Sequence, residues 1–162
     1  MKLIAEYTEQ NLEFFSEAKE GGGKKYAIEG IFMQAEQKNR NGRIYPRATM
    51  EKALDKYNTE QVTKGRAVGE LNHPEGPTVN LDKVSHKIEN LSWKGNDVVG
   101  KATILETPMG KIVQGLLDGG VHVGVSTRGM GRLKKNNGVM EVQGEFMLNA
   151  IDIVQDPCNL GC

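Results

Sequence analysis

Residues 84–105 have the sequence VSHKIENLSWKGNDVVGKATIL, and they carry the clearest secondary-structure signal of the chain. Apolar and polar residues alternate from Val84 to Trp93 and again from Val98 to Leu105, as they do in half-buried strands. Between the two runs, residues 94–97 (Lys-Gly-Asn-Asp) have the composition of a tight turn. The stretch therefore predicts an antiparallel β-hairpin, with His86 in mid-strand and facing solvent.

The flanking segments predict more strands than helices. A period-two pattern occurs in residues 24–32, and residues 67–71 read as a short apolar strand. Residues 121–133 are glycine-rich and extended, and a turn at residues 136–138 leads back into residues 139–154. Helical spacing follows Pro46, which suits the first turn of a helix, and extends over residues 108–117 before a glycine pair. Hairpins outnumber strand–helix–strand units, so we expect an α+β fold, a mainly antiparallel β-barrel surrounded by helices.

The first 23 residues differ in character from the rest. Residues 9–20 are charged with few strong apolar positions, and they run into the flexible break Gly21-Gly22-Gly23. We expect residues 1–23 to form an N-terminal arm or short helix with a glycine linker. A chain of 162 residues has room for one domain, which we place at residues 24–162.

Composition excludes several classes of function. Lys and Arg total 21 and Asp and Glu total 21, so the chain lacks the cationic surplus that binding to duplex nucleic acid requires. No apolar run approaches the length of a membrane span, and the N-terminus is too short and too acidic for a signal peptide. Cys158 and Cys162 lack the spacing of a zinc site and are interpreted as free thiols in a reducing compartment. We expect no nucleic acid, membrane, metal or cofactor.

Ser126, in the sequence Gly-Val-Ser-Thr-Arg-Gly (124–129), is the candidate nucleophile. The second glycine of a nucleophile elbow is replaced by Arg128, which excludes an α/β-hydrolase. Among the three histidines, His122 lies about 13 Å along the same strand from Ser126, too far for contact. His73 lies in a proline-bracketed loop at a strand end, with Glu70 three residues before it, which favours it as the base.

Five segments form an ordered set along the chain: residues 30–36 (GIFMQAE), 39–46 (NRNGRIYP), 69–74 (GELNHP), 93–98 (WKGNDV) and 124–129 (GVSTRG). Together they closely resemble the prohead core proteases of myovirus-type tailed phages. The resemblance covers roughly residues 26–157. It implies a serine endopeptidase related to the herpesvirus assemblins, with a β-barrel ringed by helices.

The resemblance also implies the catalytic residues. The histidine and serine of the family fall on His73 and Ser126, and by analogy the backbone around Arg128 and Gly129 would hold the oxyanion. The third member of the triad would lie about 26 residues after the serine, at Asp152. Glu70 is the alternative for that role, because it is close to His73 in sequence.

Further properties follow from the family. Members of this branch tend to cleave after glutamate in an Ile/Leu-x-Glu context and to process themselves. Residues 4–6 (Ile-Ala-Glu) fit that pattern, which makes Glu6 a self-cleavage candidate. A protease that binds a glutamate side chain needs a cationic pocket, for which Arg40, Arg43 and Arg47 are candidates.

The implied setting is the prohead, assembled in the host cytoplasm. Substrates would be scaffold or core proteins and the major capsid protein, and a homo-oligomer is possible by analogy. An alternative function is a non-catalytic core or scaffold protein that retains the protease fold. Much of the glycine excess, 20 of 162 residues, flanks Ser126, where we expect substrate to approach the backbone.

Overall fold

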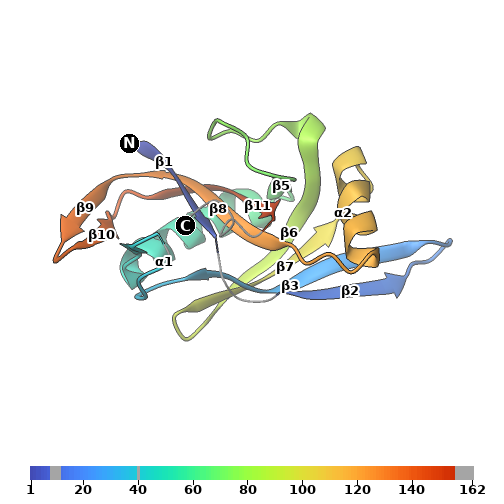
Figure 1. Ribbon diagram of the computed structural model, residues 1–162, viewed down its shortest axis with the longest axis horizontal. Helices are drawn as coiled ribbons and strands as arrows, with labels where there is room; N and C mark the ends of the chain where they lie inside the picture. The colour runs from blue at the N-terminus through green and yellow to red at the C-terminus, as the bar shows by residue number, and fades with distance from the viewer. Residues whose placement is uncertain (8–11, 40, 156–162) are drawn as a thin grey trace.

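The computed structural model describes residues 1–7, 12–39 and 41–155. Strands predominate, and short helices lie around them (Figure 1). The strands are β1 (Lys2–Tyr7), β2 (Glu13–Ala18), β3 (Lys24–Gln34), β4 (Arg43–Ile44), β5 (Val68–Glu70), β6 (Val84–Lys94), β7 (Asp97–Ile104), β8 (Gly124–Gly131), β9 (Leu133–Asn136), β10 (Val139–Val142) and β11 (Met147–Val154). The helices are α1 (Arg47–Tyr57), the π-helix η1 (Asn58–Val62), the 3-10 helix η2 (Leu81–Lys83) and α2 (Pro108–Asp118).

The predicted hairpin is present as β6 and β7, at the centre of a five-stranded antiparallel sheet with the order β2-β3-β7-β6-β5. The register pairs Trp93 with Val98 and Lys94 with Asp97, so the turn falls where the sequence placed it. Gly100 on β7 lies directly under the ring of Phe32, and a Cβ atom at this position would overlap that ring. This glycine therefore allows close packing against β3.

Two smaller sheets complete the fold. One has the order β1-β8-β11 and is antiparallel, and the other has the order β4-β10-β9, with a parallel pair between β4 and β10. The expected α+β class with mostly antiparallel sheets is confirmed. Over the described residues the strands form three separate sheets, and no closed barrel is found. The residue that follows β5 links two of the sheets, because Leu71 bridges to Ile153 of β11.

The two α-helices begin and end close to their predicted limits. Pro46 precedes α1, whose buried face includes Met50, Leu54 and Tyr57. The Thr107 hydroxyl caps α2 by accepting a hydrogen bond from the Gly110 amide at 3.0 Å.

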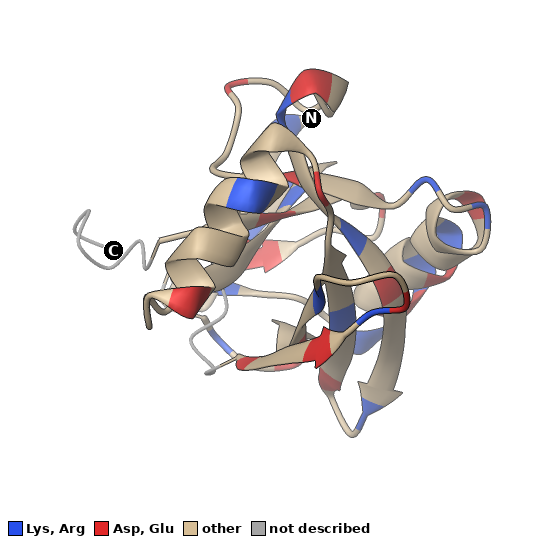
Figure 2. Ribbon diagram, turned by 90° about the vertical axis from the view of Figure 1, so that its right-hand side faces the viewer, with Lys and Arg blue, Asp and Glu red and all other residues tan. Residues whose placement is uncertain are grey.

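Within the described part of the chain, no helix is long and apolar enough to cross a membrane. Figure 2 shows that acidic and basic positions are interspersed along the elements turned toward the viewer.

Of the two forms expected for this segment, an arm or a short helix, the helix is not found in the described residues of 9–20. Residues 13–18 form β2, the outer strand of the five-stranded sheet, and pair with β3 from Glu13↔Glu29 to Ala18↔Lys24. Every side chain of β2 is exposed, so no amphipathic pattern is required for this strand. Its order comes from main-chain pairing and from Phe14, which stacks on Tyr26 with the ring centroids 5.8 Å apart.

Candidate active site

Ser126 and Asp152 lie on neighbouring strands. They are direct partners in the antiparallel β8–β11 pair, and directly opposed residues of such a pair project to the same face. Arg128, two residues beyond the serine, shares that face because side chains alternate along a strand. The Ser126 residue is 3% exposed and the Asp152 side chain is fully buried. The β8–β11 register therefore fixes the serine and the carboxylate relative to each other.

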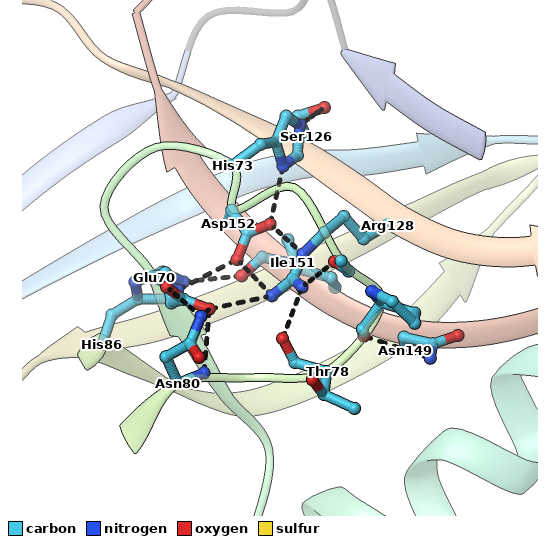
Figure 3. A network of polar contacts seen from close by, with 12 residues as sticks. Glu70, His73, Thr78, Asn80, His86, Ser126, Arg128, Asn149, Ile151 and Asp152 are labelled. Carbon is cyan, nitrogen blue, oxygen red and sulfur yellow. Dashed lines mark hydrogen bonds and ion pairs between the residues drawn. The ribbon is translucent and has the colours of Figure 1, made fainter. Parts of the chain in front are cut away.

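His73 reaches this pair from the loop after β5. The loop begins where the Asn72 amide donates to the Ile153 carbonyl at 2.7 Å, and Asn72 itself adopts a left-handed conformation with φ 69°. That turn directs His73 toward β8 and β11 (Figure 3). The Nδ1 atom of His73 lies 2.7 Å from Asp152 Oδ2, and its Nε2 atom lies 2.7 Å from Ser126 Oγ.

The protonation states follow from the contacts. Burial acts to raise the pKa of Asp152, but hydrogen bonds from His73, Arg128 and the Glu70 amide outweigh it and hold that pKa below its ordinary value. An ionised carboxylate only accepts hydrogen bonds, so His73 donates from Nδ1. In the neutral imidazole Nε2 then accepts, and the Ser126 hydroxyl donates to it. The arrangement can remove a proton from the serine hydroxyl.

The structure brings Asp152 rather than Glu70 to the histidine. Glu70 lies behind Asp152. Its backbone amide donates to Asp152 Oδ1 at 3.0 Å, and its carboxylate accepts a hydrogen bond from the backbone amide of Asn80 at 3.0 Å. Arg128 lies between the two carboxylates. Its Nε donates to Asp152 Oδ2 at 2.6 Å, and its Nη1 donates to the carbonyl oxygens of Gly76 and Thr78.

The Arg128 side chain is a functional group that the sequence interpretation missed. Only its backbone was considered there, because the resemblance placed an oxyanion-binding segment nearby. The signal was its position two residues after the serine, which places both side chains on one face. Its guanidinium is fully buried and pairs with two carboxylates.

The glycines after the serine have a packing role. A Cβ atom on Gly129 would overlap the ring of Phe146, and one on Gly131 would lie 3.0 Å from that ring and 3.2 Å from Ile4. Gly129 and Arg128 belong to the middle strand of their sheet, with β1 on one side and β11 on the other. A role of their backbone in holding an oxyanion stays a prediction.

The prediction that His86 faces solvent is wrong, because its side chain is fully buried. It shares a strand face with the buried residues Val84 and Ile88, two positions away on either side, and that parity was the available signal. Its Nε2 donates to the Ile151 carbonyl at 2.7 Å, and Nδ1 accepts from the Ser85 hydroxyl at 2.7 Å. Burial lowers the pKa of His86, which favours this neutral form.

Strand β1 pairs with β8 on the side opposite β11 and ends beside Ser126. The register pairs Glu6 with Thr127 and Tyr7 with Ser126. Glu6 is 7% exposed, and its carboxylate accepts hydrogen bonds from Asn41 Nδ2 at 2.8 Å, from Tyr45 Oη at 3.1 Å and from Arg43 Nε. A glutamate side chain one residue before the partner of Ser126 is therefore enclosed by three donors.

The three candidate arginines differ in position. Arg43 contacts Glu6, and it also donates from Nη2 to the Ala5 carbonyl at 2.9 Å. Arg47 pairs with Glu51 and lies over the Trp93 ring, 3.7 Å from its centroid, without a contact to Glu6. Arg40, Cys158 and Cys162 lie outside the described residues. Within the described ranges, no group of three or more His, Cys, Asp and Glu side chains could hold a metal ion.

Comparisons with known proteins agree with the resemblance found in the sequence. The family model for the prohead core protein serine protease matches residues 9–160, nearly the whole chain. The chain belongs to this family. Similarity to the prohead core protein protease of Enterobacteria phage T4 amounts to 44% identity over 137 residues, covering 80% of this chain and 63% of that protein. The chain thus spans less than two thirds of the length of this relative.

The fold of the chain is also similar to a solved structure. That structure is the bacteriophage T4 capsid assembly protease, gp21, with a TM-score of 0.89 and 37% identity. The match covers 96% of this chain and 98% of the solved chain. The expected family and the mostly antiparallel α+β fold are therefore confirmed together.

Proposed function

We propose that this chain is a serine endopeptidase in which Ser126 is the nucleophile, His73 the general base and Asp152 the residue that orients the histidine. The proposal rests on the two 2.7 Å contacts of the His73 ring, one to each partner. As Ser126 Oγ attacks the substrate carbonyl, His73 Nε2 takes the hydroxyl proton and then gives it to the leaving amine. Water, deprotonated by the same nitrogen, attacks the acyl-enzyme and releases the acid.

The oxyanion would be held by backbone amides around Arg128 and Gly129, two and three residues beyond the nucleophile. Their strand has one permanent partner, β11, while its other edge is paired with β1. Amides on that edge face β1 itself, and they become available to other substrates when that strand leaves. We place this machinery in a domain of residues 24–162, with residues 1–23 as an arm that contributes β1 and β2.

Glutamate is the proposed residue on the acyl side of the cleaved bond. The support is Glu6, whose carboxylate is held by Asn41, Arg43 and Tyr45 beside the nucleophile strand. Ile4, two residues before it, is also buried, whereas Ala5 between them is exposed. This alternation fits an Ile/Leu-x-Glu preference, in which the first and third side chains enter the enzyme.

Self-cleavage after Glu6 is part of the same proposal. The register pairs Tyr7 with Ser126 and Glu6 with Thr127, so the bond between Glu6 and Tyr7 lies alongside the nucleophile. Removal of residues 1–6 would open the edge of β8 to other substrates. These would be scaffold or core proteins and the major capsid protein, inside the prohead in the host cytoplasm. An assemblin-like relationship and a homo-oligomer also belong to the proposal.

The deciding experiment compares the wild type with Ser126→Ala by intact mass. We expect the wild type to lose residues 1–6 and Ser126→Ala to keep them. Ser92→Ala, which changes an exposed serine on β6, should behave as the wild type. Undiminished excision of residues 1–6 in Ser126→Ala would overturn the proposed enzymatic function and favour the alternative, a non-catalytic core or scaffold protein. A synthetic peptide of residues 2–7 gives an independent substrate for the same comparison.

A further inference from the structure

Three charged side chains are buried behind the His73 ring. Glu70 is 1% exposed, and Arg128 and Asp152 are fully buried. Figure 3 shows the arginine between the two carboxylates. With both carboxylates ionised and the guanidinium charged, this cluster carries a net charge of about −1, which becomes zero when His73 is protonated. Each member comes from a different strand, namely β5, β8 and β11.

The arginine has two opposing effects on the proposed catalysis. It holds Asp152 ionised, through Nε on Oδ2 at 2.6 Å and Nη2 on Oδ1 at 3.2 Å. However, Asp152 Oδ2 is also the oxygen that contacts His73 Nδ1. A fixed positive charge sharing this oxygen disfavours the imidazolium that forms when Ser126 gives up its proton. Something else must therefore offset the charge of Arg128.

Glu70 is placed to do so. Its Oε2 lies 3.4 Å from Arg128 Nη2, and no contact joins its carboxylate to His73 among the described residues. We propose that Glu70 is a positioning residue that acts through Arg128, offsetting the guanidinium charge so that Asp152 stabilises protonated His73. Its role in catalysis rests on the proposed function above.

The other titratable groups facing Asp152 add no charge near neutral pH. Tyr57, from α1, is buried, and burial, followed by the charge of Asp152, raises the pKa of its hydroxyl. His86, from β6, is kept neutral by burial, which lowers its pKa. Asn80, which donates to Glu70, is uncharged. Glu70 is therefore the remaining group of this set that can balance Arg128.

The test measures His73 directly in an inactive chain. The full chain carries Ser126→Ala, and the protonation midpoint of the His73 ring is followed by NMR as the pH changes. Glu70→Gln is expected to lower this midpoint by about half a unit to one unit, because one buried negative charge is lost. Asn80→Ala removes a donor to Glu70 without changing charge, and should leave the midpoint within about 0.2 units of its starting value.

A second variant covers the case in which Glu70→Gln does not fold. Asn80→Asp adds a negative charge at an exposed position beside Glu70, and it is expected to raise the midpoint by a few tenths of a unit. An unchanged midpoint in folded Glu70→Gln, or in Asn80→Asp, would overturn the proposal. An equal decrease of the midpoint in Glu70→Gln and Asn80→Ala would also overturn it, since the cause would then be structural.

Cleavage in chains that retain Ser126 separates this proposal from the proposed function. In Glu70→Gln, we expect slower excision of residues 1–6 and a displacement of the acidic limb of its rate profile toward lower pH. If no cleavage depends on Ser126 while the midpoint still decreases, the proposed function fails and the charge relationship stands. If cleavage depends on Ser126 and the midpoint is unchanged, Glu70 has no such role.

Discussion

Ser126 lies directly opposite Asp152 in the β8–β11 pair, so the proposed nucleophile and the proposed orienting carboxylate share one strand register. His73 enters from outside the sheet and contacts both side chains. A shift of one residue in this register would move Asp152 to the other face of the sheet. Any change that disturbs the pairing of β8 with β11 should therefore reduce activity before it unfolds the chain.

Asp152→Asn tests the orienting carboxylate. An amide in this place can donate toward Nδ1 and so favour the wrong tautomer of His73, and the analogous loss in a known Ser-His-Asp triad lowers the rate about 10⁴-fold. We expect a decrease of that order in the rate of excision of residues 1–6, measured by intact mass over time. A decrease of less than about threefold, with Glu70→Gln severe, would assign the role to Glu70.

Arg43→Gln tests recognition of the glutamate side chain. The variant leaves the buried Glu6 carboxylate without its cationic partner, which should slow excision about 10- to 100-fold. Arg47→Gln is the matched control, because that arginine pairs with Glu51 instead. Equal excision rates in the two variants would contradict a role of Arg43 in specificity. Glu6→Gln should reproduce the effect of Arg43→Gln.

Gly69→Ala tests the contact between β5 and β11. A Cβ atom here would overlap the Ile151 carbonyl oxygen and the His86 ring. We expect the free energy of unfolding to decrease by about 3 kcal/mol in urea titrations, because backbone and a buried ring must both move. Gly144→Ala, with no atom within 4 Å of the added methyl group, should be close to neutral. Similar stability of the two variants would rule out this packing constraint.

His86 gives a prediction for the pH dependence of stability. Burial lowers its pKa in the folded chain, so below about 6.5 the unfolded chain binds a proton that the folded chain does not. Stability should therefore decrease as the pH falls through this window, by up to about 1.4 kcal/mol per pH unit from this group. Urea unfolding of Ser126→Ala at pH 7.5 and 5.5 measures the slope.

The control for that slope is a pair of histidine variants. His86→Gln should reduce the difference between the two pH values, although the variant itself is less stable. His122→Gln, at an exposed position, should retain the difference. Asp152 contributes at a lower pH than His86. Its carboxyl pKa is lowered in the folded chain, so it stabilises the fold at pH values above its ordinary pKa of about 3.8, and this stability is lost as the pH falls further. An identical slope in His86→Gln would show that other groups cause it.

The sequence predicted local features better than the contacts between distant segments. Alternation located β6 and β7, and Pro46 located the start of α1, because both signals depend on near neighbours in the chain. Strand β2 was missed because it is charged and fully exposed, and only its pairing with β3 orders it.

The candidate site shows the same difference between local features and contacts between distant segments. Ser126 and His73 were candidates from their local sequence, but their pairing with each other and with Asp152 came from a family resemblance, since no local pattern relates residues so far apart. The burial of Arg128 and the enclosure of Glu6 depend on which strands become neighbours, and the sequence carries no direct signal for either. His86 is the exception, because its parity with Val84 and Ile88 was visible and indicates a buried position.

The pairing of β1 with β8 has a consequence for handling and assembly. While residues 2–7 remain in place, the hydrogen-bonding groups on that side of β8 are satisfied within the molecule. Once residues 1–6 are excised, the main chain of residues 127–131 loses its partner on that side, and such an edge readily takes up strands from other molecules. The chain that has lost residues 1–6 should therefore aggregate more readily in concentrated solution. The intact chain should be the better form to purify and store.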